Sequence, residues 1–512
     1  MEISPLDLFF AKTLLGADDS PQGAQFLSSL MKCAREGNLC MIHEGEIPLP
    51  ARLIEEGDRI FPSTPIVTQG NRIYLQKNWV LETHLLQQIE RLRNRKPPPF
   101  YDAALFAVAL AGTERLLPEQ KDAVRIAFDN PFTLICGGPG TGKTYTAGFL
   151  VRLLISSLDR TRKKRFRIAL AAPTGKAALH LKSTLLSQGP LDPSVRCEAF
   201  TLHRLLKLQP GETKLFSGKR IDADLILVDE ASMIDDLLFA HLLEAVGDET
   251  RLILMGDPDQ LPPVNGASLF AECSDLFGTP LKRCVRTEET SLRECADALR
   301  SGDEERFFRS ISLVGPVDGT IIESLYDKIN PLISSESPDP AACFEYYQRC
   351  RVLNALRQGP FGAEALNRHI LERMERQCRS GQWWAIPILI TVNAPRYDLY
   401  NGTSGVLIGQ KSTGIHLSEG LAYFPNSKAP VRIPPFEVSF CLSIHKSQGS
   451  EFEEVIALFP QGSENFGRES LYTAATRAKK RWEVFGEKEI LRKMLSFRTR
   501  RISGLLNRVS CR

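Results

Sequence analysis

A glycine-rich segment at 137–144 has the composition of a phosphate-binding loop. Its residues, Gly-Gly-Pro-Gly-Thr-Gly-Lys-Thr, fit the pattern G-x-x-x-x-G-K-[ST], with an apolar run before them and a helical pattern after them. Glycines let backbone N–H groups point at phosphate oxygens, and the following helix offers its positive N-terminal end. We expect Lys143 to reach the β- and γ-phosphates and Thr144 to ligate Mg²⁺. The other loop residues expected to bind the nucleotide are Gly137, Gly138, Pro139, Gly140, Thr141 and Gly142.

Two acidic residues follow the apolar run Leu225–Val228, and they suit the chemistry of hydrolysis. Asp229 is expected to be a second protein ligand of Mg²⁺, and Glu230 to position and deprotonate the attacking water. A further apolar run at 251–255 leads into Gly-Asp-Pro-Asp-Gln, where Gln260 can hydrogen-bond both a γ-phosphate oxygen and that water. The same five residues also fit an ordinary Asp-Pro turn.

A parallel sheet would bring these residues together. From about residue 104 the chain alternates short apolar runs with helical patterns, which is typical of parallel strands joined by crossover helices. Ligands bind at the carboxyl ends of such strands. The runs of the first series are 132–136, 168–172, 224–228 and 251–255, and those of a second series after about 280 are 388–392, 436–443, 454–459 and 482–485. We therefore predict an α/β fold with a parallel sheet, followed by a second series of strands.

Two regions fall outside this alternation. The first hundred residues contain short apolar segments and a helical pattern at 79–93. The cluster Arg-Lys-Pro-Pro-Pro at 95–99 must end that pattern, because proline lacks the amide N–H. We predict a mostly helical N-terminal domain at 1–100. Residues 395–435 are rich in Gly, Asn, Ser and Pro with short alternating runs, which predicts a small β insertion.

The composition is that of an ordinary globular protein. The 512 residues are 43% hydrophobic and 24% charged with a formal net charge of +3, which excludes a disordered chain and a highly charged nucleic-acid binder. No apolar run approaches the ~18 residues of a membrane helix. The N-terminus is acidic where a signal peptide would be basic, so a cytoplasmic location is expected. The twelve scattered cysteines form no C-x-x-C pair, which favours free thiols over a zinc site.

Basic residues are concentrated in two places. Six lie at 160–167, and residues 479–512 contain eleven Lys or Arg against three Glu. Such clusters can contact nucleic-acid phosphates. They can equally form a solvated loop and a frayed tail, and the sequence leaves both alternatives open.

Taken together, the motifs resemble those of superfamily 1 helicases. Asp-Glu-Ala-Ser at 229–232 and Gly-Asp-x-x-Gln-Leu-x-x-Val at 256–264 have the residues typical of that superfamily. Further segments, in the expected order, are similar to its DNA-binding motifs and to its motifs V and VI: 172–178, 201–206, 443–452 and 471–480. Resemblance to the RecD family in particular extends over about 104–506 and is carried by 201–206, 357–362, 382–409, 445–452 and 503–505.

This resemblance implies two RecA-like P-loop NTPase domains with ATP in the cleft between them. The first would span 101–278 and carry a pin hairpin near 207–222. The second would combine 279–394 with 436–512. The insertion at 395–435 would be SH3-like, and the N-terminal domain would dock on a partner subunit.

The resemblance also assigns roles to individual side chains. Arg286 and Arg477 would reach the γ-phosphate from the second domain, where a guanidinium stabilises charge on the transferring phosphoryl group. An arginine such as Arg477 is otherwise a surface residue by default. Arg286 lies in Leu-Lys-Arg-Cys-Val-Arg-Thr, where the family usually has Ser-Tyr-Arg-Phe. Gln120 would contact adenine, the alternative being an exposed residue at a helix start.

A further set of side chains would bind single-stranded DNA. Their contacts would be to the DNA backbone, which carries no sequence information and so suits a motor that passes over any sequence. Taken alone, His203 would more often be a core residue. The residues of this set are Pro173, Thr174, Lys176, His203, His445, Lys446, Ser447 and Gln448.

The function implied is that of an ATP-dependent 5′→3′ DNA helicase within a helicase–nuclease that acts in double-strand break repair and recombination. Its partners would be a RecB-like subunit, which carries the nuclease, and a RecC-like subunit, on which the N-terminal domain docks.

The first alternative is a stand-alone RecD-like helicase, which would have a long N-terminal extension. A P-loop enzyme of another class, such as a small-molecule kinase, would leave the DNA motifs unexplained. A structural subunit with a vestigial ATPase would not need the hydrolytic residues, all of which are present.

Overall fold

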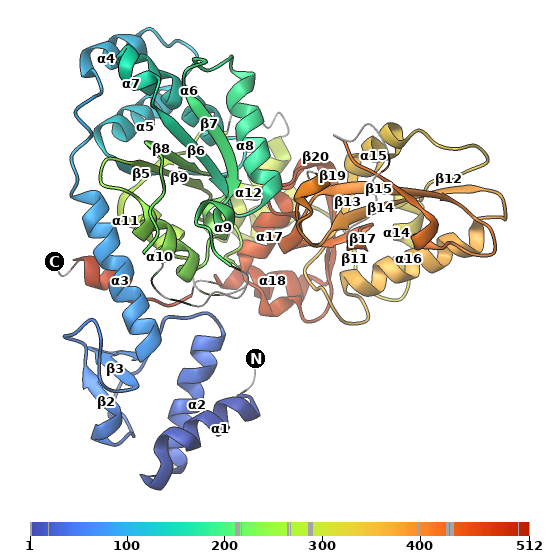
Figure 1. The fold of residues 1–512 in the computed structure, drawn as a ribbon. Helices are drawn as coiled ribbons and strands as arrows, with labels where there is room; N and C mark the ends of the chain where they lie inside the picture. The colour runs from blue at the N-terminus through green and yellow to red at the C-terminus, as the bar shows by residue number, and fades with distance from the viewer. Residues whose placement is uncertain are drawn as a thin grey trace.

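The structure of the 512-residue chain is a computed structural model. It describes residues 3–18, 20–209, 214, 216, 218–263, 266, 268–284, 290–397, 399–425, 430, 435–499 and 501–510. Figure 1 shows two large α/β bodies side by side, with the N-terminal helices below the first body. Among the described residues, no helix is long and apolar enough to cross a membrane.

A six-stranded, fully parallel sheet forms the centre of the first body. Its strand order is β10-β5-β9-β8-β6-β7. The strands are β5 (Phe132–Gly137), β6 (Arg167–Ala172), β7 (Arg196–Thr201), β8 (Leu225–Val228), β9 (Arg251–Gly256) and β10 (Gly278–Leu281). This sheet confirms the first predicted series of parallel strands.

Helices cover both faces of the first sheet, which is why its strands are continuous apolar runs. In β5, Ile135 packs into one core and the neighbouring Leu134 into the other. The helices over the first core are α4 (Ala103–Ala111), α5 (Pro118–Asp129), α6 (Lys143–Ser156) and α8 (Gly175–Ser187). Those over the second are α3 (Gln76–Arg93), α9 (Leu202–Leu205), α10 (Asp236–Ala245) and α11 (Leu269–Phe277).

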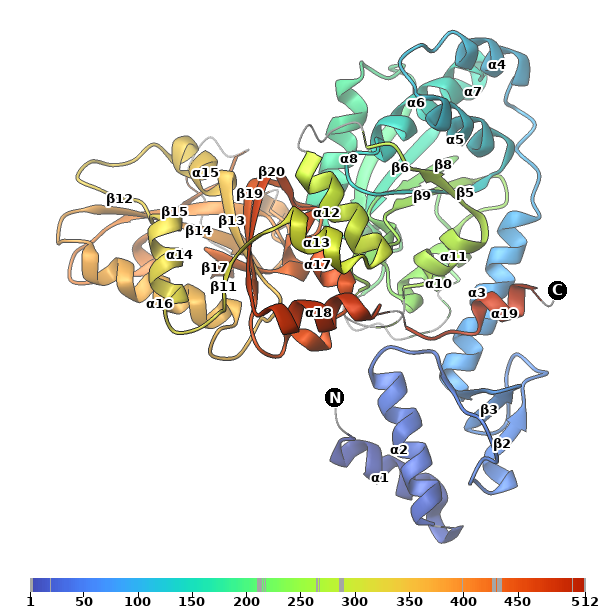
Figure 2. The ribbon, with the colours of Figure 1, turned by 180° about the vertical axis from the view of Figure 1, so that it is seen from behind.

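A second parallel sheet, of five strands, has the order β11-β20-β19-β13-β18. The strands are β11 (Ser312–Gly315), β13 (Cys350–Asn354), β18 (Cys441–Ser443), β19 (Phe452–Phe459) and β20 (Ala478–Gly486). Around it lie α12 (Thr290–Ser301), α13 (Glu304–Ser310), α14 (Ile321–Ile329), α15 (Pro340–Arg349), α16 (Ala363–Gln377), α17 (Arg468–Ala475) and α18 (Lys488–Ser496). Figure 2 shows α12 and α17 on the side of this sheet that faces the first body. The predicted α/β fold with two parallel sheets is thereby confirmed.

A small antiparallel sheet extends from the second body, and it corrects two strand assignments. Its strands are β12 (Ile333–Ser334), β14 (Trp383–Ile390), β15 (Ser404–Gln410), β16 (Leu421–Tyr423) and β17 (Phe436–Val438). The run 388–392, predicted as a parallel strand, belongs largely to β14. The run 436–443 divides between β17 here and β18 of the parallel sheet. A continuous apolar run reports burial on both faces and does not report strand direction.

The N-terminal region combines helices with a sheet that the sequence analysis did not include. The helices are α1 (Pro5–Leu15), α2 (Pro21–Arg35) and α3, which confirms the helical pattern at 79–93. A four-stranded sheet has the order β1-β4-β3-β2, with β1 (Cys40–Ile42), β2 (Ile54–Glu56), β3 (Ile66–Gln69) and β4 (Arg72–Leu75). Strands of three or four residues are too short to give a clear alternation.

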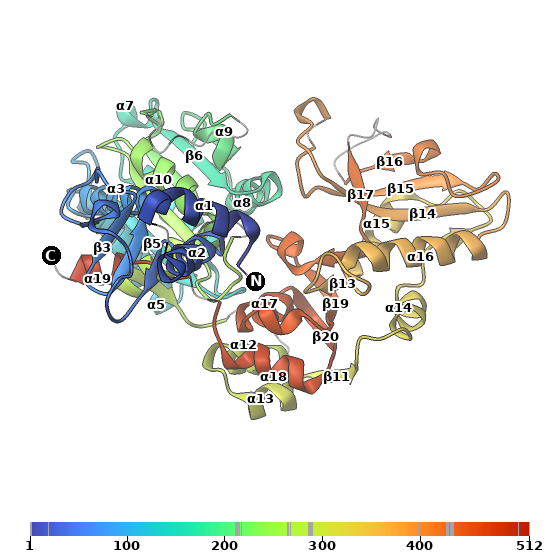
Figure 3. The same cartoon turned by 90° about the horizontal axis from the view of Figure 1, so that it is seen from below.

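The C-terminal segment, 501–510, returns to the N-terminal region and is not a frayed tail. Its helix α19 (Leu505–Ser510) lies beside α3 in Figures 1 and 3. Arg508 Nη1 lies 3.1 Å from Glu82 Oε1 of α3, and Nη2 donates to Thr83 Oγ1 at 2.8 Å. The backbone N–H of Gly504 donates to Glu82 Oε2 at 2.8 Å. Since Glu82 is fully buried, these bonds satisfy a charge that would otherwise strongly destabilise the fold.

The other basic run is also partly built into the fold. Its residues include α7 (Arg160–Lys163). Arg162 pairs with Asp224 at 2.9 Å, and its guanidinium lies 4.0 Å from the centroid of the Phe100 ring. The hairpin expected near 207–222 lies partly outside the described residues.

Candidate nucleotide and DNA site

The phosphate-binding loop connects the end of β5 at Gly137 to the start of α6 at Lys143. Gly140 and Gly142 have φ values of 73° and 80°, a left-handed conformation that glycine adopts without steric cost. Lys143 Nζ donates to the carbonyl oxygens of Gly137 and Gly138, at 2.8 and 3.2 Å. The ammonium is therefore held inside the curve of the loop, as the motif predicts.

Thr144, in the first turn of α6, and Asp229, directly after β8, come together at the carboxyl edge of the first sheet. Thr144 Oγ1 donates to Asp229 Oδ2 at 3.1 Å, and the other carboxylate oxygen accepts the N–H of Glu230 at 2.9 Å. A hydroxyl and a carboxylate are the oxygen ligands that Mg²⁺ prefers, and magnesium sites beside phosphates use few protein ligands. The residues present fit the expected metal.

Glu230 has two properties of a general base. Its backbone is left-handed, with φ 54°, a conformation that is unusual for a residue with a side chain and that is enriched at functional sites. Burial raises the pKa of its carboxyl, and the charge of Asp229 raises this pKa further, whereas Arg477 and Lys143 oppose the rise. A carboxylate with a raised pKa accepts a proton more readily near neutral pH.

Gln260 lies in the segment that follows β9, and it is buried. Its Nε2 donates to Asp257 Oδ2 at 3.3 Å, while its Oε1 has no hydrogen-bond partner among the described residues. A buried amide oxygen without a partner is costly, which favours a site where a water or ligand completes the bond. This geometry supports the hydrolytic role over the plain turn.

The Gln120 side chain forms a hydrogen bond with the backbone of the phosphate-binding loop. Its Oε1 accepts the N–H of Leu117 at 3.0 Å, and its Nε2 donates to the carbonyl of Thr141 at 3.1 Å. The side chain is only 3% exposed, so the alternative of an exposed helix-start residue is wrong. Its contact with adenine stays a prediction.

Of the two predicted arginines, Arg477 lies among the described residues and is buried. Arg477 is 3% exposed, which excludes a surface role. Its Nε donates to Thr473 O at 3.3 Å and its Nη1 to Ser450 O at 3.1 Å. Its charge acts on the Glu230 carboxyl, so the two lie in one electrostatic environment. Arg286 lies outside the described residues.

Lys176 joins the two bodies at the expected DNA path. Its Nζ donates to Ser450 Oγ, from the other body, at 2.8 Å. Burial lowers the pKa of Lys176 to about 8, and the charges of Arg351 and Arg477 lower it further. Pro173 and Thr174 precede α8, and the Thr174 hydroxyl caps this helix by accepting the N–H of Ala177 at 3.2 Å.

The segment 445–448, predicted to contact DNA, is largely buried in this structure. Ser447 is fully buried and donates to Ile444 O at 2.6 Å, and Gln448 Nε2 donates to Leu261 O at 3.0 Å. Lys446 Nζ lies 2.6 Å from a carboxylate oxygen of Glu437. Burial lowers the pKa of the partly exposed His445, and the charge of Arg501 lowers it further.

His203 is exposed on α9, so the alternative of a core residue is wrong. Its DNA contact, like those of the other seven residues in the set, stays a prediction.

Sequence reasoning did not single out Tyr472 or Arg300, both of which reach this site from the second body. Tyr472 is buried on α17 and donates from its hydroxyl to Asp257 Oδ2 at 2.9 Å. Arg300 Nη2 donates to the same tyrosine hydroxyl at 2.6 Å. Tyr472 lies within the quoted segment 471–480, but nothing in the sequence around Arg300 indicates a site.

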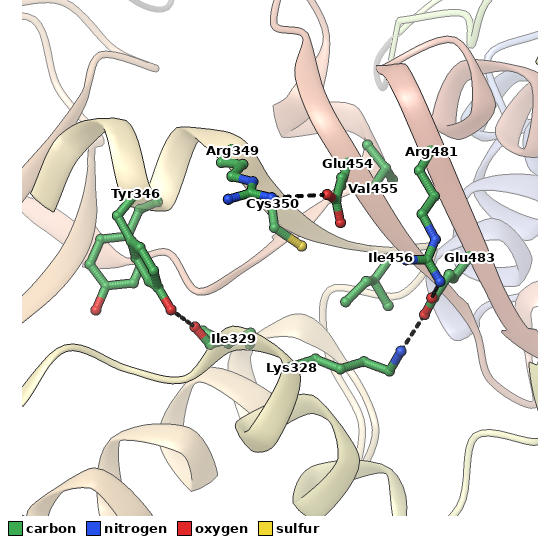
Figure 4. Close-up of a pocket in the computed structure, with 11 residues that line it drawn as sticks. Lys328, Ile329, Tyr346, Arg349, Cys350, Glu454, Val455, Ile456, Arg481 and Glu483 are labelled. Atoms are coloured by element: carbon green, nitrogen blue, oxygen red, sulfur yellow. Dashed lines mark hydrogen bonds and ion pairs between the residues drawn. The ribbon is translucent and has the colours of Figure 1, made fainter. Parts of the chain in front are cut away.

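A separate cavity of about 300 Å³ lies between α14, α15 and the second parallel sheet (Figure 4). None of the predicted site residues lines it. Its charges are paired with one another: Glu483 contacts Lys328 at 2.5 Å and Arg481 at 2.6 Å, and Arg349 lies 3.8 Å from Glu454. These pairs leave little charge to attract a phosphate.

Comparisons with known proteins agree with this geometry. A family model described as "AAA domain" matches residues 120–266, and one described as "UvrD-like helicase C-terminal domain" matches 439–482. The RecBCD enzyme subunit RecD of Mycolicibacterium smegmatis is 31% identical, covering 99% of this chain and 97% of that protein. The same subunit of Mycobacterium tuberculosis is 33% identical, covering 85% of this chain and 80% of that protein. The ATP-dependent RecD2 DNA helicase of Deinococcus radiodurans is 27% identical, covering 84% of this chain and 57% of that protein.

A P-loop, its acidic pair and the helicase motifs of a second parallel-sheet body together define an ATP-dependent DNA helicase of superfamily 1. Within that class the chain belongs to the RecD family, as its identity to the two mycobacterial subunits over most of their length shows.

Proposed function

We propose that this chain is a 5′→3′ DNA motor that works as a subunit of a RecBCD-type helicase–nuclease in double-strand break repair and recombination. We also propose that the two parallel-sheet bodies are the two core domains, predicted at 101–278 and at 279–394 with 436–512; the first extends at least to Leu281, because β10 pairs with β5. The nuclease of the assembly would belong to a RecB-like partner, and the protein would act in the cytoplasm.

The observation that carries the motor proposal is a pair of hydrogen bonds between the backbone of Leu261 and the second body. The N–H of Leu261 donates to Thr473 Oγ1 of α17 at 2.9 Å, and its carbonyl accepts from Gln448 Nε2 at 3.0 Å. The preceding residue is Gln260, the expected sensor of the γ-phosphate. A shift of Gln260 would therefore pass through Leu261 to α17 and to the DNA-binding segment around Gln448.

Hydrolysis would use groups already in place. Lys143 would bind the β- and γ-phosphates, while Thr144 and Asp229 would hold Mg²⁺. When bound, the metal would supply positive charge to the phosphate oxygens. Glu230 would accept the proton of the attacking water, and Gln260 would orient that water through its unpartnered Oε1. Closing and opening of the cleft would then move Lys176 and its DNA contact relative to the second body.

The direction of movement can be tested on the isolated chain with single-stranded oligonucleotides that carry streptavidin at one end. A 5′→3′ motor pushes streptavidin off the 3′ end in the presence of ATP and leaves the 5′ end occupied. Lys143→Ala is the matched control, because it keeps the fold and loses the phosphate contact, and it should displace neither. ATP-dependent displacement from the 5′ end alone would contradict the proposed polarity.

The partner proposal has support from the N-terminal helix. Leu6 and Phe9 of α1 are 68% and 69% exposed, and Leu8 and Phe10 are also exposed. An exposed apolar patch of this kind is typical of a protein–protein contact. The relatives named as RecBCD subunits are 26–33% identical to this chain, which covers 80–97% of their length, whereas it covers 57% of the 27% identical RecD2 helicase; this likeness supports a RecC-like partner.

Affinity purification of the native protein tests this docking. We expect a RecB-like and a RecC-like chain to co-purify with the wild type and to be lost with the double variant Leu6→Asp, Phe9→Asp. The control is Val108→Asp, which places the same charge at a 73% exposed apolar residue of α4 and should retain both chains. Recovery of the wild-type chain alone would favour the stand-alone alternative.

A further inference from the structure

Arg300, near the end of α12, lies directly against the phosphate-binding loop of the other body. A methyl group placed on Gly138 would overlap with the Arg300 guanidinium and would lie 2.9 Å from the Tyr472 hydroxyl. Gly138 also accepts a hydrogen bond from Lys143 Nζ at 3.2 Å. Arg300 and Lys143 therefore flank the same residue of the loop, one from each body.

Four contacts hold the Arg300 side chain in this position, one of them within α12, where Nη1 lies 3.2 Å from Asp297 Oδ1. Nη2 donates to the Tyr472 hydroxyl at 2.6 Å, and the guanidinium carbon lies 5.2 Å from the centroid of the same ring. Nε lies 3.4 Å from Asp259 Oδ2, which belongs to the first body. The side chain stays 33% exposed, so it is not sealed inside the interface.

We propose that Arg300 is a further catalytic residue of the ATPase, which contacts the γ-phosphate across the cleft between the two bodies. A phosphate bound to Lys143 Nζ at this loop would lie within reach of a guanidinium that already touches Gly138. The assignment goes beyond Arg286 and Arg477, the two arginines that the family resemblance indicates.

The chemistry suits a guanidinium at this point. As the oxygen of water bonds to the γ-phosphorus, the bond from phosphorus to the bridging oxygen breaks, and its electron pair stays on the departing ADP. The proton of the water passes to Glu230. Negative charge on the phosphoryl oxygens is then stabilised by the N–H groups of Arg300, a planar donor set that matches phosphate geometry.

The surroundings allow Arg300 to turn toward a phosphate without leaving Asp259 uncompensated. Arg498 Nη2 lies 3.6 Å from Asp259 Oδ1, so a second arginine remains beside that carboxylate. The same Arg498 nitrogen donates to the carbonyl of Arg300 at 3.1 Å and fixes the backbone from which the side chain extends.

The test compares Arg300→Ala and Arg300→Lys with Arg309→Ala, which removes the same charge from a 77% exposed residue of the neighbouring helix α13. Three quantities are measured on each preparation: DNA-stimulated kcat, affinity for ADP with and without aluminium fluoride, and melting temperature. We expect Arg300→Ala to lower kcat by about 10³-fold, as loss of an arginine finger does. Binding of ADP with aluminium fluoride, a mimic of the transferring phosphoryl group, should weaken at least about tenfold, since only interactions specific to the transition state are lost.

ADP affinity and melting temperature of Arg300→Ala should equal those of the wild type, and Arg309→Ala should be unchanged in every measurement. Arg300→Lys keeps a cation beside Asp259 but not the planar donor set, so it should fold and recover only part of kcat. A kcat of Arg300→Ala within about twofold of wild type would overturn the proposal, because a finger contributes far more than that. Equal weakening of ADP with and without aluminium fluoride would also overturn it, because that pattern indicates a structural contact between the bodies.

Discussion

At the scale of single residues, the site places charged groups where burial changes their chemistry. Glu230 has a raised pKa and Lys176 a lowered one, and both changes are caused first by burial. The raised pKa makes Glu230 a better proton acceptor. The lowered pKa makes the charge of Lys176 sensitive to pH in a range where an ordinary lysine stays protonated.

Lys176 therefore predicts a pH dependence of DNA binding. DNA phosphates favour the charged lysine, so its pKa in the complex must exceed the value of about 8 in the free protein. Affinity should be constant below pH 8 and fall as pH rises above it, by up to about tenfold per pH unit. Binding of a fluorescent single strand at constant ionic strength, from pH 7 to 9.5, measures this.

Lys176→Arg is the matched control, because arginine stays charged throughout this range. Its DNA affinity should change much less between pH 8 and 9.5. Parallel slopes for the wild type and the variant would show that Lys176 does not contact DNA through its charge.

At the scale of elements, the first sheet could be predicted closely and the rest only in part. The strands β5, β6, β8 and β9 agree with the predicted runs to within one residue at each end, because strands buried on both faces must be apolar throughout. The edge strand β7, Arg-Cys-Glu-Ala-Phe-Thr, was missed because it is only half buried and carries charged residues. The parallel pairing predicted for the run that forms β14 was wrong, because burial of a strand does not determine the direction of its neighbours.

The candidate site could also be predicted only in part. Lys143, Thr144 and Asp229 follow from a contiguous motif or from a strand end, so their meeting could be predicted. The place of Arg300 depends on how α12 packs against α17, which no local pattern records. The burial of Ser447 and Gln448 likewise depends on tertiary packing, and their contact with DNA stays a prediction.

At the scale of the whole molecule, several of the contacts between the two bodies that the described residues make lie at the nucleotide and DNA sites. Lys176 bonds to Ser450, Leu261 bonds to Thr473 and Gln448, and Arg300 lies against Gly138. An enzyme built in this way can convert changes at the phosphates into relative movement of its two halves. The C-terminal segment, 501–510, packs against α3 of the N-terminal region through Gly504 and Arg508.

The central claim is that this cleft hydrolyses ATP for movement on DNA, with Glu230 as the base. The measurement that tests it most directly is ATP turnover of the wild type and Glu230→Gln, with and without single-stranded DNA, together with ATP affinity. We predict that DNA stimulates the wild type. Glu230→Gln, which keeps the size of the side chain, should bind ATP normally and turn over about 10²–10⁴-fold more slowly, the usual contribution of a general base. Turnover of Glu230→Gln at the wild-type rate, or wild-type turnover indifferent to DNA, would contradict the claim.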